Sequence, residues 1–497
     1  MATIPATIYY SSRFADLRYK KLGKTGFTTS VCGFGCYRVD NSVPEHHKAL
    51  ELAIENGINL IETSSNYSFG GSEELVGNVI RQLLSTEKII RDDVIIVTKG
   101  GYLQGENLDK AKTKEKDGKP YKDVIKCSSD LWHCIHPDFL KTQLNNSLEK
   151  LRLDKIDIYL LHNPEYFLTY SDISSLEKKL DEYYGRIKLA FEYLESEVKK
   201  GKISFYGISS NTFAEPGDKN NFTSLERVYN IAGEISGKNH FAVIQFPMNL
   251  IEQGGILNKN QVNNTKTVLE FAKEKDIGVL INRPLNAISE NKIIRLADFE
   301  IIKNKSKKEI MDLISKLAGY EKELIDRYVN KMNENFSKKK NLLDALSLGK
   351  ILDENYDKFD SPNHFRDIKG YNLIPKANFA VIEISKFFKD DDDELSDLLN
   401  NYAVTVNITL DSIESDLARE WNEQNKKRHT ELNNFLPDDK KEYNLAHKSI
   451  LLLNSLNEIS CTLVGMRKTN YVHDILKVIR FDINENVAKY WESAKND

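Results

Sequence analysis

The chain has 497 residues, and its 70 Lys and Arg against 74 Asp and Glu give a formal net charge of −4. A charge this close to zero argues against a general binder of nucleic acid or of anionic membranes. Hydrophobic residues make up 40% of the chain and charged residues 29%, which is typical of a globular protein. No apolar run approaches the roughly 18 residues of a transmembrane helix, so we expect no membrane span.

The N-terminal segment and the cysteines bear on the compartment. Residues 1–21 contain no continuous apolar stretch of the kind that a secretory signal needs. The cysteines are too few for a disulfide framework in a chain of this length: Cys32, Cys36, Cys127, Cys134 and Cys461. We therefore expect reduced thiols and a cytoplasmic protein.

From residue 29 onward, short β-branched segments alternate with helical patterns. The predicted strands are 29–35, 58–63, 93–99, 155–162, 203–210, 242–247, 277–284 and 461–466. This alternation indicates βαβ units and a parallel sheet, and continuously apolar strands indicate burial on both faces. The pattern predicts an α/β fold, a (β/α)8 TIM barrel.

Two local signals refine this reading. Ser42 and Glu45 have the spacing of a capping box, which predicts a helix that begins after Ser42 and ends at Gly57. The segment from residue 100 to Pro137, where a further helix begins, reads as a long polar loop.

The segment between the seventh and eighth predicted strands is far longer than a barrel unit needs. We therefore divide the chain into 1–289, with the N-terminal segment and strands one to seven; 290–442, a charged and mostly helical insertion; and 443–497, the last helix–strand–helix and the tail. The insertion leaves the barrel after a strand's carboxyl end, so it could wall the active site or bind a protein partner.

In a barrel of this kind, reactive side chains lie at the carboxyl ends of the strands. Glu62, Lys99 and His162 occupy such ends, and Tyr67 lies in the loop after Glu62. A buried ammonium next to a phenol stabilises the phenolate and lowers its pKa, while a carboxylate keeps the ammonium charged. A phenol tuned in this way can exchange a proton with a substrate oxygen, and a His can polarise a carbonyl.

These residues lie in motifs that resemble the aldo-keto reductases. The matching segments are KLGKTGFTTSVCGFG, INLIETSSNYSFGGSEELVG, DVIIVTKGGYLQG, KIDIYLLHNPEYF, GKISFYGISSN, VIQFPMNLIE and TLVGMRKTNYVHDIL. They cover nearly everything outside the insertion. The family's Asp, Tyr, Lys and His tetrad falls on Glu62, Tyr67, Lys99 and His162 of this sequence.

The resemblance implies a role for each of these positions. Tyr67 would be the general acid/base, Lys99 and Glu62 would tune its pKa, and His162 would orient the substrate carbonyl. The cofactor residues implied are Cys36 and Tyr37 after strand one; Ser209, Ser210, Asn211 and Gln245 around the nicotinamide carboxamide; Arg283, Pro284 and Leu285 at the pyrophosphate; and Gly465, Met466, Arg467 and Lys468 at the adenosine end. The basic pair Arg467 and Lys468 suits a 2′-phosphate and favours NADP(H) over NAD(H).

Three positions depart from the family pattern. Glu62 stands where the family usually has Asp, and is one methylene longer. The family's Ser-Asn pair appears as Ser209-Ser210, with Asn211 one position later. Asn282 stands where an aromatic residue often stacks on the nicotinamide, so stacking would be lost or supplied by Tyr37.

The sequence therefore predicts an enzyme, an oxidoreductase that transfers a hydride between NADP(H) and an aldehyde, ketone, alcohol or sugar. The three departures and the insertion keep open a cofactor-binding regulatory or scaffold protein on the same barrel. A sugar dehydrogenase that runs oxidatively with NAD is a further alternative. The expected partner is a small molecule and not nucleic acid or a membrane. We expect no metal at Cys127, His133, Cys134 and His136, whose spacing matches no common zinc finger.

Overall fold

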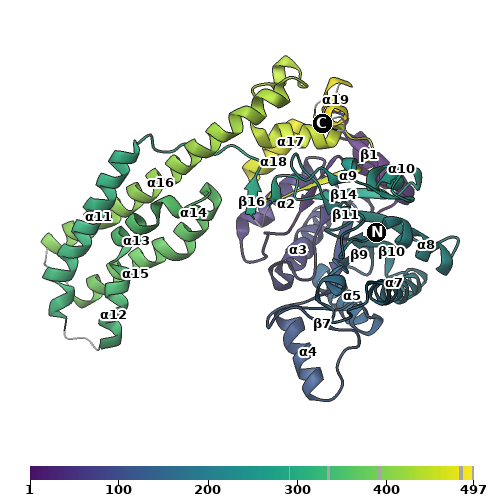
Figure 1. Cartoon of the computed structure of the whole chain (residues 1–497), viewed down its shortest axis with the longest axis horizontal. Helices are drawn as coiled ribbons and strands as arrows, with labels where there is room; N and C mark the ends of the chain where they lie inside the picture. Colours follow the sequence, from purple (N-terminus) through teal and green to yellow (C-terminus); the bar gives the residue numbers. More distant parts are fainter. Residues whose placement is uncertain (290–291, 333–335, 389–392, 481–484, 495–497) are drawn as a thin grey trace. The chain divides into compact units, whose positions relative to one another are not determined.

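A computed structural model describes residues 1–289, 292–332, 336–388, 393–480 and 485–494 (Figure 1). The chain divides into two compact units, one of 1–296 with 435–497 and one of 297–434. Each unit is described by itself. Within the described residues, no helix is both long and apolar enough to cross a membrane.

The first unit is a closed barrel of parallel strands. In chain order the strands are β3 (Cys32–Gly35), β4 (Leu60–Glu62), β5 (Ile95–Gly100), β9 (Ile156–His162), β10 (Ile203–Ser209), β11 (Phe241–Pro247), β14 (Gly278–Asn282) and β17 (Cys461–Val464). Each strand pairs with the next one in the chain, and β17 closes the ring on β3. The predicted (β/α)8 barrel is confirmed, and every predicted strand contributes to it.

The barrel interior explains why these segments are strands. Every residue of β9 and β11 is buried, and apolar side chains from all around the ring pack into one central cluster. The hairpin of β1 (Tyr19–Lys21) and β2 (Thr28–Ser30) adds Leu22 and Phe27 to that cluster. Gly23 lies in this hairpin with φ of 48°, where an added Cβ would fall 2.2 Å from the backbone nitrogen of Gly278. Only glycine fits such an approach.

Helices cover the outside of the barrel (Figure 1). They are α2 (Pro44–Glu55), α3 (Gly71–Ser85), α5 (Pro137–Leu151), α7 (Leu176–Lys199), α8 (Leu225–Ile235), α10 (Val268–Glu274), α17 (Leu445–Ser455) and α18 (Thr469–Ile479). Shorter or terminal helices are α1 (Ile4–Ser12), α6 (Tyr166–Tyr170), α9 (Gly254–Leu257) and α19 (Glu485–Ala494). The small hairpin of β12 (Lys259–Gln261) and β13 (Lys266–Thr267) precedes α10.

The predicted capping box before α2 is wrong. The N-cap is Val43, which makes no side-chain cap, and Ser42 Oγ instead donates to Asp40 Oδ1 at 2.5 Å. Glu45 accepts from the backbone N–H and the hydroxyl of Thr469, both at 2.9 Å, at the start of α18. A tertiary partner therefore takes the carboxylate that the local pattern assigned to its own helix.

The segment expected to be a polar loop after the third strand has structure of its own. It contains β6 (Tyr102–Leu103), α4 (Glu106–Lys116), β7 (Ile125–Lys126) and β8 (Trp132–His133), with β8 at the centre of a small antiparallel sheet. Trp132 and Cys134 pack with Leu103, Leu108 and Phe139 in a separate apolar cluster. The loop prediction failed because this small core is spread thinly among charged residues.

A second correction concerns the start of the expected helical insertion. The strands β15 (Asn286–Ser289) and β16 (Lys292–Arg295) form an antiparallel pair, with Ile288 opposite Ile293. This pair belongs to the barrel unit.

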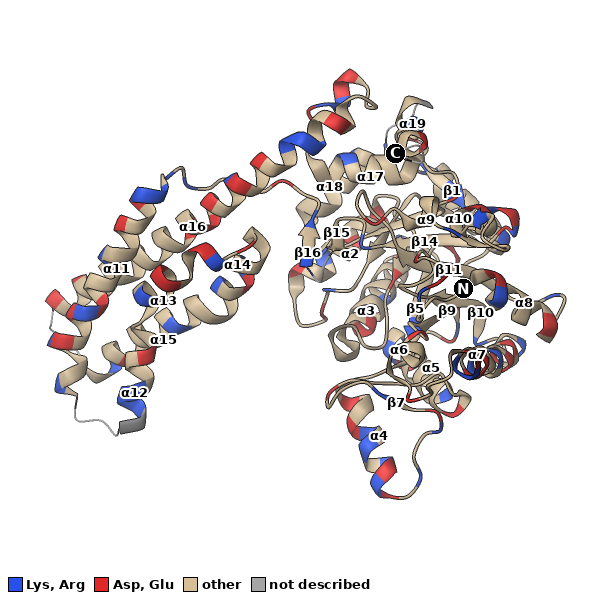
Figure 2. Cartoon of the chain, in the orientation of Figure 1, with Lys and Arg blue, Asp and Glu red and all other residues tan. Residues whose placement is uncertain are grey.

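The second unit, 297–434, is helical. Its helices are α11 (Lys307–Arg327), α12 (Phe336–Ala345), α13 (Leu348–Asn355), α14 (Pro362–Ile368), α15 (Ile374–Phe387) and the long α16 (Asp393–Asn433). They enclose their own apolar cluster, and Figure 2 shows acidic and basic residues interspersed along them. This unit lies inside the predicted 290–442 insertion. The boundaries at 289/290 and 442/443, and a protein partner for the insertion, stay predictions.

Candidate active site

Four predicted residues come together at the carboxyl ends of three neighbouring strands. Glu62 ends β4, Lys99 lies near the end of β5 and His162 ends β9, while Tyr67 begins the short 3-10 turn after β4. Lys99 Nζ donates to Tyr67 Oη at 2.7 Å and also binds Glu62 Oε1. Tyr67 Oη in turn donates to Glu62 Oε1 at 3.3 Å. The longer side chain of Glu62 thus reaches both partners.

Burial governs the electrostatics of this cluster. Lys99 is fully buried, and Glu62 and Tyr67 are nearly so. Burial, followed by the charge of Glu62, raises the pKa of Tyr67 well above its ordinary value, and burial lowers the pKa of Lys99. The expectation of a lowered Tyr67 pKa is therefore wrong for this ligand-free form, because desolvation opposes the phenolate. Tyr67 is a protonated phenol, ready to donate.

His162 is held from two sides. Its Nδ1 lies 3.1 Å from Ser64 Oγ, and its backbone oxygen accepts from His133 Nε2 at 2.7 Å. The Tyr102 ring meets the imidazole edge-on, with centroids 4.6 Å apart. Burial, and then the charge of Lys99, lowers the pKa of His162 well below its ordinary value. The imidazole is neutral and can polarise a carbonyl without carrying charge.

The residues expected around the nicotinamide lie at the ends of β3, β10 and β11. Cys36 follows β3 and is buried, whereas Tyr37 is 67% exposed and meets the Tyr67 ring edge-on at 5.2 Å. Ser209 ends β10, Ser210 N donates to the backbone oxygen of Gln245 at 2.9 Å, and Asn211 N donates to Glu165 Oε1 at 2.8 Å.

The residues expected along the phosphates follow β14 and β17. Arg283 has φ of 51° and forms an ion pair with Glu252 at 2.6 Å, and burial lowers its pKa. Pro284 and Leu285 follow it before β15. After β17 come Gly465, Met466, Arg467 and Lys468, of which Met466 is buried and Lys468 is the N-cap of α18.

Three polar atoms test whether a nicotinamide cofactor fits these residues. Gln245 Oε1, Asn282 Oδ1 and Arg283 Nε are buried and have no hydrogen-bond partner among the described residues. All three belong to side chains at the ends of β11 and β14 or just after them. A buried polar atom without a partner costs free energy, so such atoms indicate a polar ligand. An amide and a guanidinium fit the carboxamide and the phosphates of the cofactor.

Sequence reasoning missed four residues that hold the site. Ser64 and His133 fix His162, Glu165 accepts from Asn211 N, and Glu252 binds Arg283. Ser64 follows a predicted strand directly and could have been found from that position. The partners of His133, Glu165 and Glu252 lie 29 or more residues away in the chain, so no local pattern marks them.

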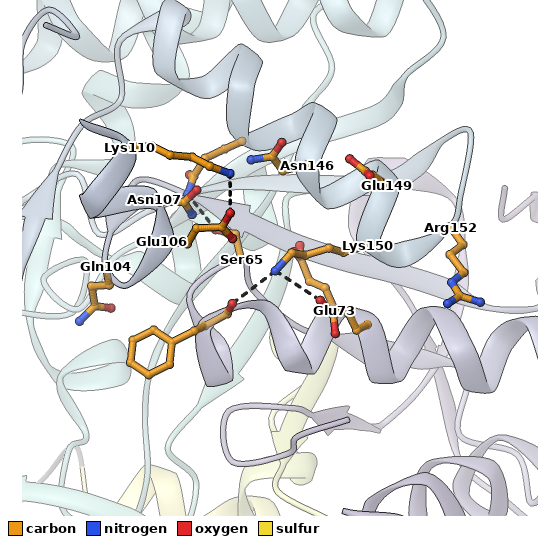
Figure 3. Close-up of a pocket in the computed structure, with 13 residues that line it drawn as sticks. Ser65, Glu73, Gln104, Glu106, Asn107, Lys110, Asn146, Glu149, Lys150 and Arg152 are labelled. Atoms are coloured by element: carbon orange, nitrogen blue, oxygen red, sulfur yellow. Dashed lines mark hydrogen bonds and ion pairs between the residues drawn. The ribbon is translucent and has the colours of Figure 1, made fainter. Parts of the chain in front are cut away.

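A pocket of about 500 Å³ lies beside this cluster (Figure 3). It is lined mainly by charged and amide side chains from α3, α4 and α5, together with Ser65 and Phe69. None of the four clustered residues lines it. Lys110 pairs with Glu106 across it at 2.8 Å, and Lys150 lies 3.6 Å from Glu74.

Fold and site together define a barrel protein with a buried Tyr–Lys–carboxylate cluster at the strand ends. A sequence profile of the Aldo/keto reductase family matches residues 33–496, and the chain belongs to this family of oxidoreductases.

Several relatives carry names. The chain is 30% identical over 213 residues to the uncharacterised oxidoreductase YqkF of Bacillus subtilis, covering 42% of this chain and 55% of that one. It is 23% identical over 227 residues to the 6-dehydroglucose reductase of Novosphingobium aromaticivorans, covering 44% and 59%. It is 25% identical over 198 residues to the NAD(P)H-dependent D-xylose reductase of Scheffersomyces stipitis, covering 37% and 50%. The chain thus spans about half the length of these relatives.

Solved structures show a similar fold at low identity. The holo form of aldo-keto reductase AKR11C1 from Bacillus halodurans is 14% identical with a TM-score of 0.45, and 96% of each chain is covered. The glycerol dehydrogenase AKR11B4 from Gluconobacter oxydans is 16% identical with a TM-score of 0.44, covering 96% of this chain and 94% of that one.

Proposed function

We propose that the protein interconverts a small-molecule carbonyl and the corresponding alcohol with a nicotinamide cofactor. The observation that carries this proposal is the cluster in which Tyr67 Oη accepts from Lys99 Nζ at 2.7 Å and donates to Glu62. A phenol held between a buried ammonium and a carboxylate is suited to proton transfer and little else.

In the direction of reduction, Tyr67 donates its Oη proton to the carbonyl oxygen of the substrate. Lys99 stabilises the phenolate that forms, and Glu62 keeps Lys99 oriented. The neutral imidazole of His162 polarises the same carbonyl. When bound, the cofactor supplies the hydride for the carbonyl carbon.

The orphaned Oε1 of Gln245 would accept a hydrogen bond from the nicotinamide carboxamide, together with the Ser209–Asn211 segment. Arg283 would bind the pyrophosphate once it leaves Glu252, and the exposed ring of Tyr37 is the candidate to stack where Asn282 replaces an aromatic residue. Arg467 and Lys468 would bind a 2′-phosphate, so we propose NADP(H) as the preferred cofactor.

The test is oxidation of NADPH by the purified protein with a panel of aldehydes and sugars, followed at 340 nm. Tyr67→Phe is expected to lower kcat by roughly 10²- to 10⁴-fold while NADPH still binds. Tyr9→Phe, at an exposed site on α1, is the matched control. Full activity of Tyr67→Phe contradicts the proposal. Tight NADPH binding by fluorescence titration without turnover of any substrate supports the regulatory alternative instead.

A further inference from the structure

The turn that follows Tyr67 is strained. Ser68 and Phe69 have φ of 48° and 53°, and Gly70 has φ of 98°, so three consecutive residues are left-handed. Residues other than glycine rarely adopt this region, and they keep it only where the surroundings hold them there. Tyr67 begins this turn, so what holds the turn also fixes the start of the Tyr67 side chain.

Two side chains from elsewhere in the barrel unit hold the turn. Ser68 Oγ donates to the backbone oxygen of Val39 at 2.8 Å. Lys150, in the last turn of α5, donates through Nζ to the backbone oxygen of Phe69 at 3.3 Å. An added Cβ on Gly70 would fall 1.8 Å from this Nζ, so the ammonium lies directly against the α-carbon of Gly70.

Lys150 also separates the turn from the pocket of about 500 Å³, which it lines together with Phe69 and Glu74. Figure 3 draws the Lys150 side chain with dashed lines to its two partners, a backbone oxygen and a carboxylate. Glu74 lies 3.6 Å from Nζ and keeps the ammonium beside the turn. If Lys150 is removed, the Phe69 carbonyl faces an open, polar cavity.

We propose that Lys150 is a positioning residue: through the Phe69 carbonyl it holds the left-handed turn that keeps Tyr67 Oη on Lys99. This inference rests on the proposed function for its effect on rate, because Tyr67 must be the proton donor. Its structural half, the holding of the turn, is independent of any activity.

The experiment compares Lys150→Met with Lys141→Met, a change at an exposed lysine of the same helix. Lys150→Met is expected to lower kcat about tenfold with the KM for NADPH unchanged, since displacement of a reacting group by about 1 Å is costly. Lys150→Arg, which keeps a donor and the charge, is expected to restore most of the rate. Lys141→Met should match the wild type.

Amide hydrogen exchange of the full chain provides the second readout. Peptides that cover residues 64–72 contain the Tyr67 and Phe69 amides, which donate to Ser64 O and Asn66 O. Lys150→Met should speed exchange there and leave the other barrel peptides unchanged. Wild-type exchange in this segment, or a kcat within about twofold of the wild type, overturns the proposal. If the wild type itself has no turnover, the proposed function fails and the exchange result alone decides whether Lys150 holds the turn.

Discussion

Gln245 and Glu62 meet across the barrel. Gln245 Nε2 donates to Glu62 Oε1 at 3.3 Å, although their strands, β11 and β4, lie four places apart in the closed ring of eight. The amide donates on one side to the carboxylate of the Tyr67 cluster, and its Oε1 has no partner among the described residues. One side chain thus connects the proton-transfer cluster with the proposed carboxamide site.

Replacing Gln245 with Leu removes both hydrogen-bonding groups. We expect affinity for NADPH to fall about tenfold, because one hydrogen bond to the carboxamide contributes about 1 kcal/mol or somewhat more. Fluorescence titration of the free protein measures this. Gln82→Leu is the control, since Gln82 donates to Glu51 on the exposed outer helices. Unchanged affinity in Gln245→Leu would place the carboxamide elsewhere.

The extra methylene of Glu62 brings its carboxylate to Tyr67, and the charge there raises the Tyr67 pKa. Glu62→Asp should draw the carboxylate back, weaken that effect and lower the Tyr67 pKa. Alcohol oxidation, which needs the phenolate, should then gain rate by up to about tenfold at a given pH for each unit of pKa. The measurement is kcat for oxidation between pH 7 and 10. A loss of rate would mean instead that the shorter carboxylate releases Lys99.

Tyr67 should also make the two reaction directions respond differently to pH. Its pKa is raised above the ordinary value near 10, so the phenol stays protonated through about pH 9. Carbonyl reduction, with the phenol as donor, should be nearly flat from about pH 6 to 9. Oxidation should rise with pH, by about tenfold for each unit. Equal profiles in the two directions would indicate that another group transfers the proton.

The insertion contains its own titrating carboxyl. Glu321, on α11, accepts from the backbone N–H groups of Leu348 and Gly349 at 2.8 and 3.0 Å at the start of α13. Burial raises its pKa to about 7. A carboxyl whose pKa is higher in the folded state stabilises the fold most at low pH, and this contribution is lost as pH rises through about 7.

We therefore expect the unfolding free energy of the full chain to fall by on the order of 3 kcal/mol from this group between pH 5 and 8. Urea unfolding across that range measures it. Glu321→Gln keeps the shape and cannot ionise, so its profile should lose this part of the slope. Glu323→Gln, an exposed neighbour paired with Arg327, is the control. Identical slopes in the wild type and Glu321→Gln contradict the assignment.

Much of the barrel could be predicted because the signals are local. Every residue of 156–162 is buried in a strand because the barrel interior lies on one side and helices on the other. The start of α5 at Pro137 and the end of α2 before Gly57 likewise depend on backbone properties of single residues. The small sheet in 102–133 was missed because its strands are only two residues long, below the length at which periodicity can be read.

The sequence by itself determined which residues stand at the ends of the barrel strands, since the strand pattern and the positions of Glu62, Lys99 and His162 are both written along the chain. Only the tertiary structure decided what those residues touch and how they ionise. Closure of the ring brings Gln245 to Glu62, and packing desolvates Tyr67 so that its pKa rises where the residue types alone suggested a fall. Desolvation and Coulomb energy depend on burial and distance in three dimensions, and neither can be read from spacing in the sequence.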